Sequence, residues 1–113
     1  MTAADVRAVI EVRQLRRRYL GFEADDAAWS MMLELYATRL EARPLHQTRL
    51  GMRAGVPETT ALRVTRRMLA AGLFTAEPHP ADKRLVVIGL SDAIAERIRA
   101  YLAASRALAG LAA

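Results

Sequence analysis

The stretch EPHPADKRLVVIGL, from Glu77 to Leu90, departs from a sequence that otherwise has the pattern of helices. The runs LFTAE (73–77) and LVVIGL (85–90) are rich in β-branched and aromatic residues, which predicts two strands. The segment PHPADKR lies between them, and its prolines cannot continue a ladder of backbone hydrogen bonds. The stretch therefore predicts a β-hairpin with a projecting, charged tip.

Helices are predicted on both sides of this hairpin, because apolar residues recur there at three- and four-residue spacings. They cover residues 4–19, 25–43, 47–55, 58–71 and 91–113. The turn Gly55-Val56-Pro57 joins the third to the fourth, since glycine suits a helix end and proline a helix start. Two helices joined by such a turn form a helix-turn-helix, and a hairpin directly after it makes a winged helix.

The predicted fold is mainly α with a small β-hairpin, a winged helix-turn-helix with flanking N- and C-terminal helices. We expect a single domain over residues 1–113. The N-terminal helices would occupy 1–42, the helix-turn-helix and wing 43–90, and the C-terminal helix 91–113.

The N- and C-terminal helical regions, which flank the helix-turn-helix and wing, carry more apolar surface than a small monomer readily hides. In the second helix the predicted main stripe is Trp29, Met32, Leu33, Tyr36 and Leu40, with Met31 and Leu35 widening it. We therefore expect a C2 homodimer. Its predicted interface residues are Trp29, Tyr36, Ile98, Tyr101 and Leu102.

Composition excludes several classes of protein. The sequence has no cysteine, and His46 and His79 lie far apart, so it offers no metal site and no cofactor. No nucleophile–base pair, glycine-rich phosphate loop or carboxylate cluster is recognisable, which predicts that the protein is not an enzyme. No apolar run reaches the ~20 residues of a membrane span, and the N-terminus lacks the order of a signal peptide. We therefore expect no membrane partner and a cytoplasmic protein.

Positive charge is concentrated in the middle of the chain. The sequence has 17 Lys and Arg against 12 Asp and Glu, a net charge of +5. Between Arg43 and Arg84 there are eight basic and three acidic residues, so this segment accounts for the whole excess. Such a concentration indicates a polyanionic partner.

Residues 43–92 resemble the DNA-binding core of bacterial MarR-type (multiple antibiotic resistance) winged-helix regulators. The resemblance rests on the order of a G-V-P turn, a T-T-x-x-x-R helix, an A-A-G-L exit, a D-x-R wing and an L-S-D start to the next helix. It implies that the second helix of the motif enters the major groove and that the wing reaches the adjacent backbone or minor groove. The residues it places at DNA are Thr59, Thr60, Arg63, Arg66 or Arg67, Lys83 and Arg84. It also implies that Asp82 pairs with Arg84 and holds the wing rigid.

The residues support this placement on chemical grounds. The arginine side chain is a planar fork that suits phosphate or the O6/N7 edge of guanine. An alternative for the arginines is pairing with Glu58 or Glu77 on a solvated face, and an alternative for Thr59 is helix capping. Arg49 and Arg53, at i and i+4 of the preceding helix, would contact the backbone and position the protein.

The sequence thus predicts a dimeric, sequence-specific double-stranded DNA-binding transcriptional regulator. One alternative is a winged-helix protein–protein adaptor, in which the arginines of the second motif helix would be paired with acids. Another is a ligand-responsive regulator with an apolar cavity near Trp29, Tyr36 and Tyr101. A small-molecule effector is possible on this reading, but no residue pattern indicates one.

Overall fold

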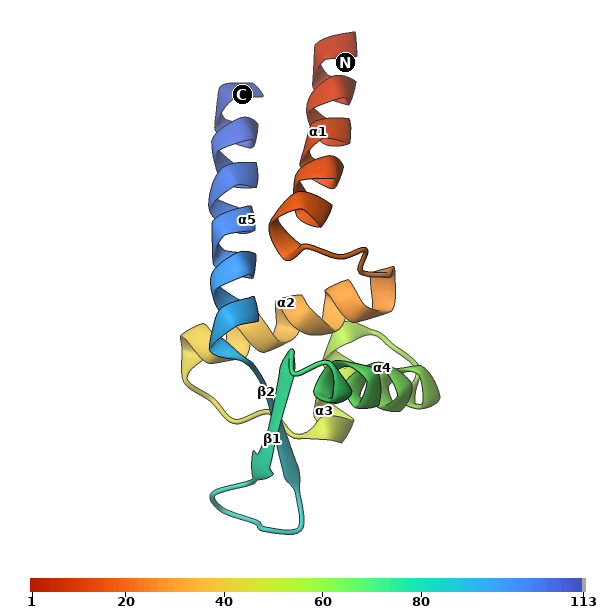
Figure 1. Ribbon diagram of the computed structural model, residues 1–113, viewed down its shortest axis with the longest axis vertical. Helices are drawn as coiled ribbons and strands as arrows, with labels where there is room; N and C mark the ends of the chain where they lie inside the picture. Colours follow the sequence, from red (N-terminus) through yellow and green to blue (C-terminus); the bar gives the residue numbers. More distant parts are fainter. Residues whose placement is uncertain (113) are drawn as a thin grey trace. The chain divides into compact units, whose positions relative to one another are not determined.

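Three helices and a two-stranded hairpin form the unit of residues 24–93. They are α2 (Asp26–Glu41), α3 (Gln47–Ala54), α4 (Glu58–Ala70), β1 (Phe74–Pro78) and β2 (Val86–Leu90). The structure, a computed structural model, describes residues 1–112 and the side chains of residues 1–108. In Figure 1 the hairpin projects from the helices of this unit. The predicted fold class, mainly α with one hairpin, is confirmed.

Asp25 caps the N-terminus of α2, and its carboxylate accepts a hydrogen bond from the Ala28 N–H at 2.8 Å. The residues it buries are Ala28, Met31, Met32, Leu35 and Thr38. Of the predicted main stripe, Met32 is buried, Trp29, Leu33 and Tyr36 are half-buried, and Leu40 is 71% exposed, so only Leu40 lies outside the packed side of the helix. Thr38 enters the core because its hydroxyl lies 3.1 Å from the carbonyls of both Glu34 and Leu35, which satisfies its polar group inside the helix.

The turn between α3 and α4 depends on two glycines. Gly55 ends α3 with a φ of 68°, in the left-handed region that favours glycine. A Cβ at Gly51 would lie 2.9 Å from the Ala61 Cβ, so α3 and α4 approach too closely there for any side chain. The predicted helix-turn-helix is present, with α4 ending one residue before the predicted bound.

The hairpin pairs β1 with β2 in antiparallel register, from Phe74 opposite Leu90 to Pro78 opposite Val86. Strand β1 thus includes Pro78, which was expected to lie outside it. A further strand-like contact was not predicted: His46 forms a bridge to Val87, and the Ile88 N–H donates to the Leu45 carbonyl at 3.0 Å. The segment before α3 therefore anchors the base of the hairpin.

The other unit combines residues 1–23 with the chain from residue 94 onward. Its helices are α1 (Ala3–Leu20) and most of α5 (Asp92–Ala112). Arg97 of α5 donates to the carbonyl of Leu20 at 3.0 Å, where α1 ends. Helix α1 leaves apolar side chains exposed, namely Val6, Val9, Ile10 and Tyr19. None of the helices in the described part of the chain is long and apolar enough to cross a membrane.

One buried polar atom makes a stability prediction possible. Thr65 of α4 is buried, and its Oγ1 has no hydrogen-bond partner among the described residues. Thr65→Val keeps the shape and removes the unsatisfied hydroxyl, so we expect the free energy of unfolding to rise by about 1 kcal/mol. Urea unfolding followed by circular dichroism measures it, with Thr60→Val, on the same helix, as the control. A clear loss of stability in Thr65→Val would contradict the prediction.

Candidate nucleic-acid interface

The outward face of α4 carries two unpaired arginines. Successive residues of an α-helix are about 100° apart, so the buried side of α4 fixes which residues point away from the core. The buried side chains are Ala61, Val64, Thr65 and Met68. The opposite face carries Thr59, Arg63 and Arg66, all exposed. Neither Arg63 nor Arg66 forms an ion pair within the described part of the chain, so both guanidinium groups are available to a ligand.

The threonines of α4 do not cap it. The N-cap residue is Pro57, and no side chain forms a capping hydrogen bond there. Thr59 is exposed and Thr60 is half-buried. Their hydroxyls, together with the backbone N–H groups of the first turn, can therefore donate to an anion.

Arg67 lies on the flank of α4 and differs from its two neighbours. Its Nη2 donates to Asp25 Oδ2 at 3.3 Å. The two side chains are 52% and 57% exposed, so the pair contributes only about 0.2–1 kcal/mol to stability. The acid that pairs with Arg67 is neither Glu58 nor Glu77, the two partners considered from the sequence.

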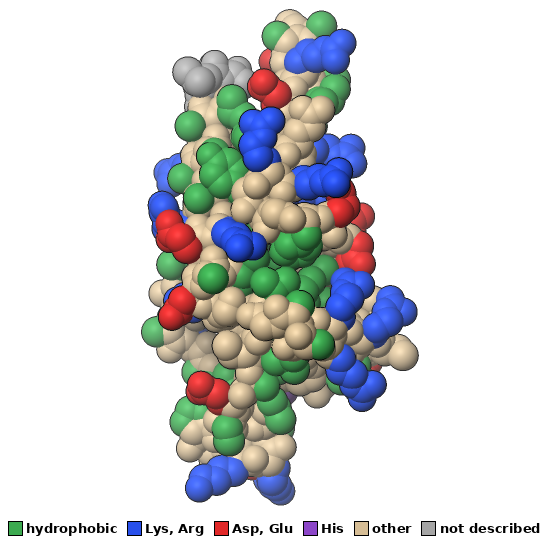
Figure 2. All heavy atoms as spheres, in the orientation of Figure 1, with side chains coloured by type: hydrophobic (Ala, Val, Ile, Leu, Met, Phe, Trp, Pro, Cys, Tyr) green, Lys and Arg blue, Asp and Glu red, His purple; other side chains and the backbone are tan. Residues whose placement is uncertain are grey.

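Helix α3 adds two more arginines. Leu50 and Gly51 are buried, whereas Arg49 and Arg53, four residues apart, are exposed on the opposite face. Figure 2 shows Lys and Arg side chains gathered over α3 and α4 and at the end of the hairpin. The basic residues between 43 and 84 are thus brought together on the unit of residues 24–93.

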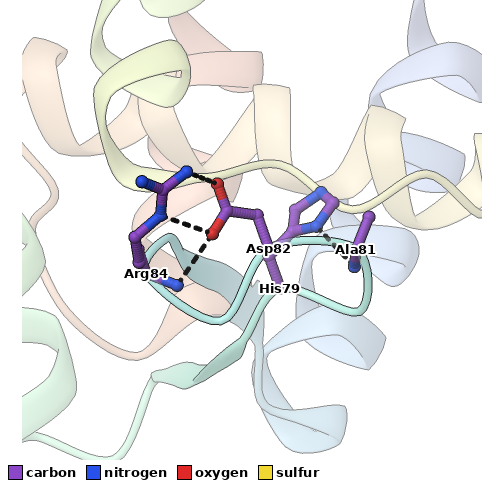
Figure 3. Close-up of polar contacts among 4 residues, drawn as sticks. All are labelled: His79, Ala81, Asp82 and Arg84. Atoms are coloured by element: carbon purple, nitrogen blue, oxygen red, sulfur yellow. Dashed lines mark hydrogen bonds and ion pairs between the residues drawn. The ribbon is translucent and has the colours of Figure 1, made fainter.

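The hairpin tip is shaped by Asp82 (Figure 3). Its Oδ1 accepts from the backbone N–H and the Nε of Arg84 at 3.1 and 3.0 Å, and its Oδ2 accepts from Arg84 Nη2 at 3.0 Å. The side-chain hydrogen bonds from Arg84 lower the pKa of Asp82 most, and the bond from the Arg84 backbone lowers it further. The Asp82–Arg84 pair that the resemblance implies is therefore present.

Two further bonds set the shape of the tip. His79 Nδ1 accepts from the Ala81 N–H at 3.0 Å, so this nitrogen is the unprotonated one (Figure 3). The backbone N–H of His79 donates to the Leu85 carbonyl at 2.9 Å. Lys83 is exposed and has no ion-pair partner among the residues described. The tip thus presents one free ammonium group on a loop held by local hydrogen bonds.

Arg39 was not predicted to have a role. Its Nη1 donates to the Leu90 carbonyl at 3.3 Å, and its Nη2 pairs with Asp92 Oδ1 at 2.7 Å. Because it lies in the last turn of α2, it fixes the end of β2 and the start of α5 to that helix. No local signal in the sequence indicates this contact, since the partners are more than 50 residues away.

The predicted dimer-interface residues differ in exposure. Trp29, Tyr36 and Leu102 are half-buried. Ile98 and Tyr101 are already buried in the single chain, at 0% and 7% exposed. The interface assigned to these five residues stays a prediction. No group of three or more His, Asp or Glu that could hold a metal ion is found among the described residues.

Comparison with known proteins places the fold. No protein-family model matches the sequence, and no curated protein matches it. Several solved structures are similar to this chain in fold. A probable transcriptional regulator from Pseudomonas aeruginosa has 24% identity and a TM-score of 0.64, over 90% of this chain and 74% of its own.

Two other similar solved structures are complexes, one with DNA and one with a ligand. A point mutant of S. aureus MepR bound to an oligodeoxyribonucleotide has a TM-score of 0.74 at 15% identity, over 95% of this chain and 74% of its own. The PcaV transcriptional regulator from Streptomyces coelicolor, in complex with its natural ligand, has a TM-score of 0.59 at 20% identity, over 90% of this chain and 72% of its own. This chain has the winged helix-turn-helix fold of MarR-type transcriptional regulators.

Proposed function

We propose that this protein is a sequence-specific double-stranded DNA-binding transcriptional regulator that acts as a homodimer. The observation that carries the proposal is the outward face of α4, where Arg63 and Arg66 are exposed and unpaired within the described residues. The adaptor alternative requires the arginines of α4 to be paired with acids, and among the residues that the structure describes only Arg67 of the three has such a pair. The solved structure of DNA-bound MepR, which shares the fold, adds support.

In the proposed complex α4 lies in the major groove, which is wide enough to admit an α-helix. Arg63 and Arg66 would contact base edges or phosphates, and Thr59 and Thr60 would donate to phosphate. Arg49 and Arg53 would contact the backbone outside the groove and set the register. The hairpin tip, residues 78–84, would reach the flanking backbone or minor groove through Lys83 and Arg84.

A second copy of the chain is the proposed partner of α1. Exposed Val6, Val9 and Ile10 lie on this helix at three- and four-residue spacings, an apolar face that a copy related by C2 symmetry would cover. A dimer would present two α4 helices to half-sites about one helical turn apart. Sedimentation equilibrium tests this, with a mass twice that of the chain as the expected result and a monomer at all concentrations as the contradicting one.

Fluorescence anisotropy with a random duplex of about 30 base pairs, titrated over a salt series, tests DNA binding. We expect the logarithm of the affinity to fall linearly with the logarithm of the salt concentration, because phosphate contacts release counterions. Selection of duplexes from a random pool then identifies the preferred sequence. Absence of salt-dependent binding, even at low ionic strength, would refute the proposed function.

A chemical probe of the wing follows from its composition. Lys83 is the only lysine of the sequence, so acetylation of lysine reports on the hairpin tip alone. We expect saturating duplex to slow acetylation of Lys83 severalfold, because a phosphate-bound ammonium is less nucleophilic and less accessible. Mass spectrometry of peptides measures the rate, with added Nα-acetyl-lysine amide as the reference amine. An unchanged rate under saturation would show that the tip does not touch DNA.

A further inference from the structure

Asp25 bridges the first turn of α2 and the flank of α4. Its Oδ1 accepts from the Ala28 N–H at 2.8 Å and its Oδ2 from Arg67 Nη2 at 3.3 Å. The hydrogen bond from the Ala28 N–H is the largest cause that lowers the pKa of Asp25. The guanidinium groups of Arg67 and Arg63 lower this pKa further. The carboxylate is therefore ionised at neutral pH and lies in the field of two arginines of α4.

The pair could in principle hold α4 in place, but the packing of the helix makes this unnecessary. Four side chains of α4 are buried, among them Val64 and Met68, and α4 packs against α2, α3 and β1. An ion pair whose side chains are both about half exposed adds little to such packing. Its loss would leave α4 where it is and would release the Arg67 guanidinium.

A released Arg67 would change DNA binding. Arg67 is four residues from Arg63, so the two side chains are neighbours on the helix surface, about 40° apart around the axis. A long arginine side chain at this place can reach a phosphate beside the groove that α4 occupies. In the folded chain the guanidinium of Arg67 is already paired with the carboxylate of Asp25.

We propose that Asp25 competes with DNA phosphate for Arg67 and thereby limits the sequence-independent affinity of the protein for DNA. The inference rests on the proposed function. Sequence-independent binding is supplied by phosphate contacts, each of which adds about 0.9 to the slope of log affinity against log salt. An acid that occupies one arginine beside the groove removes one such contact and disfavours binding at random sites.

Asp25→Asn tests this, because asparagine caps helices as well as aspartate does and only the charge is lost. With the random duplex of about 30 base pairs, we expect it to bind roughly five- to tenfold more tightly than the wild type at about 0.1 M salt, with a salt slope steeper by about 0.9. The double variant Asp25→Asn/Arg67→Ala should lose this gain, since the arginine that makes the new contact is gone.

Asp26→Asn is the matched control. Asp26 is the next residue, exposed, and forms no ion pair within the described residues, so it has the same charge change without releasing an arginine. We expect a smaller gain in affinity and an unchanged slope. Urea unfolding of Asp25→Asn and Asp26→Asn checks that the fold is kept.

The outcomes separate the inference from the proposed function. If the wild type binds with a salt-dependent affinity and Asp25→Asn gains nothing beyond Asp26→Asn, the inference is overturned and the proposed function stands. Weaker binding by a folded Asp25→Asn would also overturn it and would assign the pair to positioning α4. If neither the wild type nor any variant binds the duplex, both fail.

Discussion

Replacing Arg63 and Arg66 together by alanine is expected to lower the affinity for duplex DNA by at least about 30-fold near 0.1 M salt. Each arginine that contacts a base or phosphate contributes about 1–3 kcal/mol, and both side chains are exposed on one face of α4 and form no ion pair within the described residues. The slope of log affinity against log salt should become shallower by up to about 2, because two phosphate contacts are lost at most. Fluorescence anisotropy over a salt series measures both quantities.

The control for this variant is Arg7→Ala/Arg13→Ala. It makes the same change in net charge, at exposed positions of α1 that lie outside the basic segment. We expect it to lower the affinity far less than the α4 double variant. Equal losses in the two variants would mean that overall charge, and not the face of α4, binds the DNA.

The largest expected effect on stability is that of Leu50→Ala. Leu50 is fully buried in α3, and truncating a buried leucine costs about 2–5 kcal/mol through the lost burial and the cavity left behind. A domain of this size has a free energy of unfolding of about 5–15 kcal/mol, so the variant should be markedly destabilised. Urea unfolding followed by circular dichroism gives the difference.

Met52→Ala serves as the comparison, because Met52 is an apolar residue two positions away on the same helix but is 75% exposed. Its removal should change the free energy of unfolding by no more than about 0.5 kcal/mol. A similar loss in both variants would contradict the assignment of Leu50 to the core and of Met52 to the surface.

The elements predicted well from the sequence are those with local signals. Gly55 and Pro57 mark the turn of the helix-turn-helix, and the prolines and β-branched runs mark the hairpin. The contact between Asp82 and Arg84 spans only two residues, so a short motif suffices to indicate it. In each of these cases the cause of the structure lies within a few residues along the chain.

The face of α2 could not be predicted in the same way. This helix is apolar around most of its circumference, so periodicity does not select one stripe. The side of α2 that carries Leu35 faces the core. Thr38 is buried on this side because its hydroxyl donates to carbonyls of its own helix. A pattern of polar and apolar residues counts that threonine as polar, so it does not indicate that Thr38 is buried.

The roles of the three arginines of α4 were equally undetermined. Arg66 and Arg67 are chemically identical in the sequence, and only tertiary packing places one outward and the other on the flank. The partner of Arg67 lies 42 residues earlier in the chain. The bridge between His46 and Val87 could not be predicted for the same reason. The segment around His46 is too short to be recognised as a strand, and its partner lies 41 residues away in the sequence.

The division of the chain into two units has a consequence for synthesis on the ribosome. Residues 24–93 are continuous, so this unit can fold as soon as it has left the exit tunnel. Helix α1 precedes that unit in sequence and α5 follows it. The carbonyl of Leu20, at the end of α1, accepts its hydrogen bond from Arg97 of α5, so α1 waits for this neighbour helix until residue 97 has been translated. During that interval α1 is the segment most open to capture by a chaperone or by a nascent copy from the same polysome.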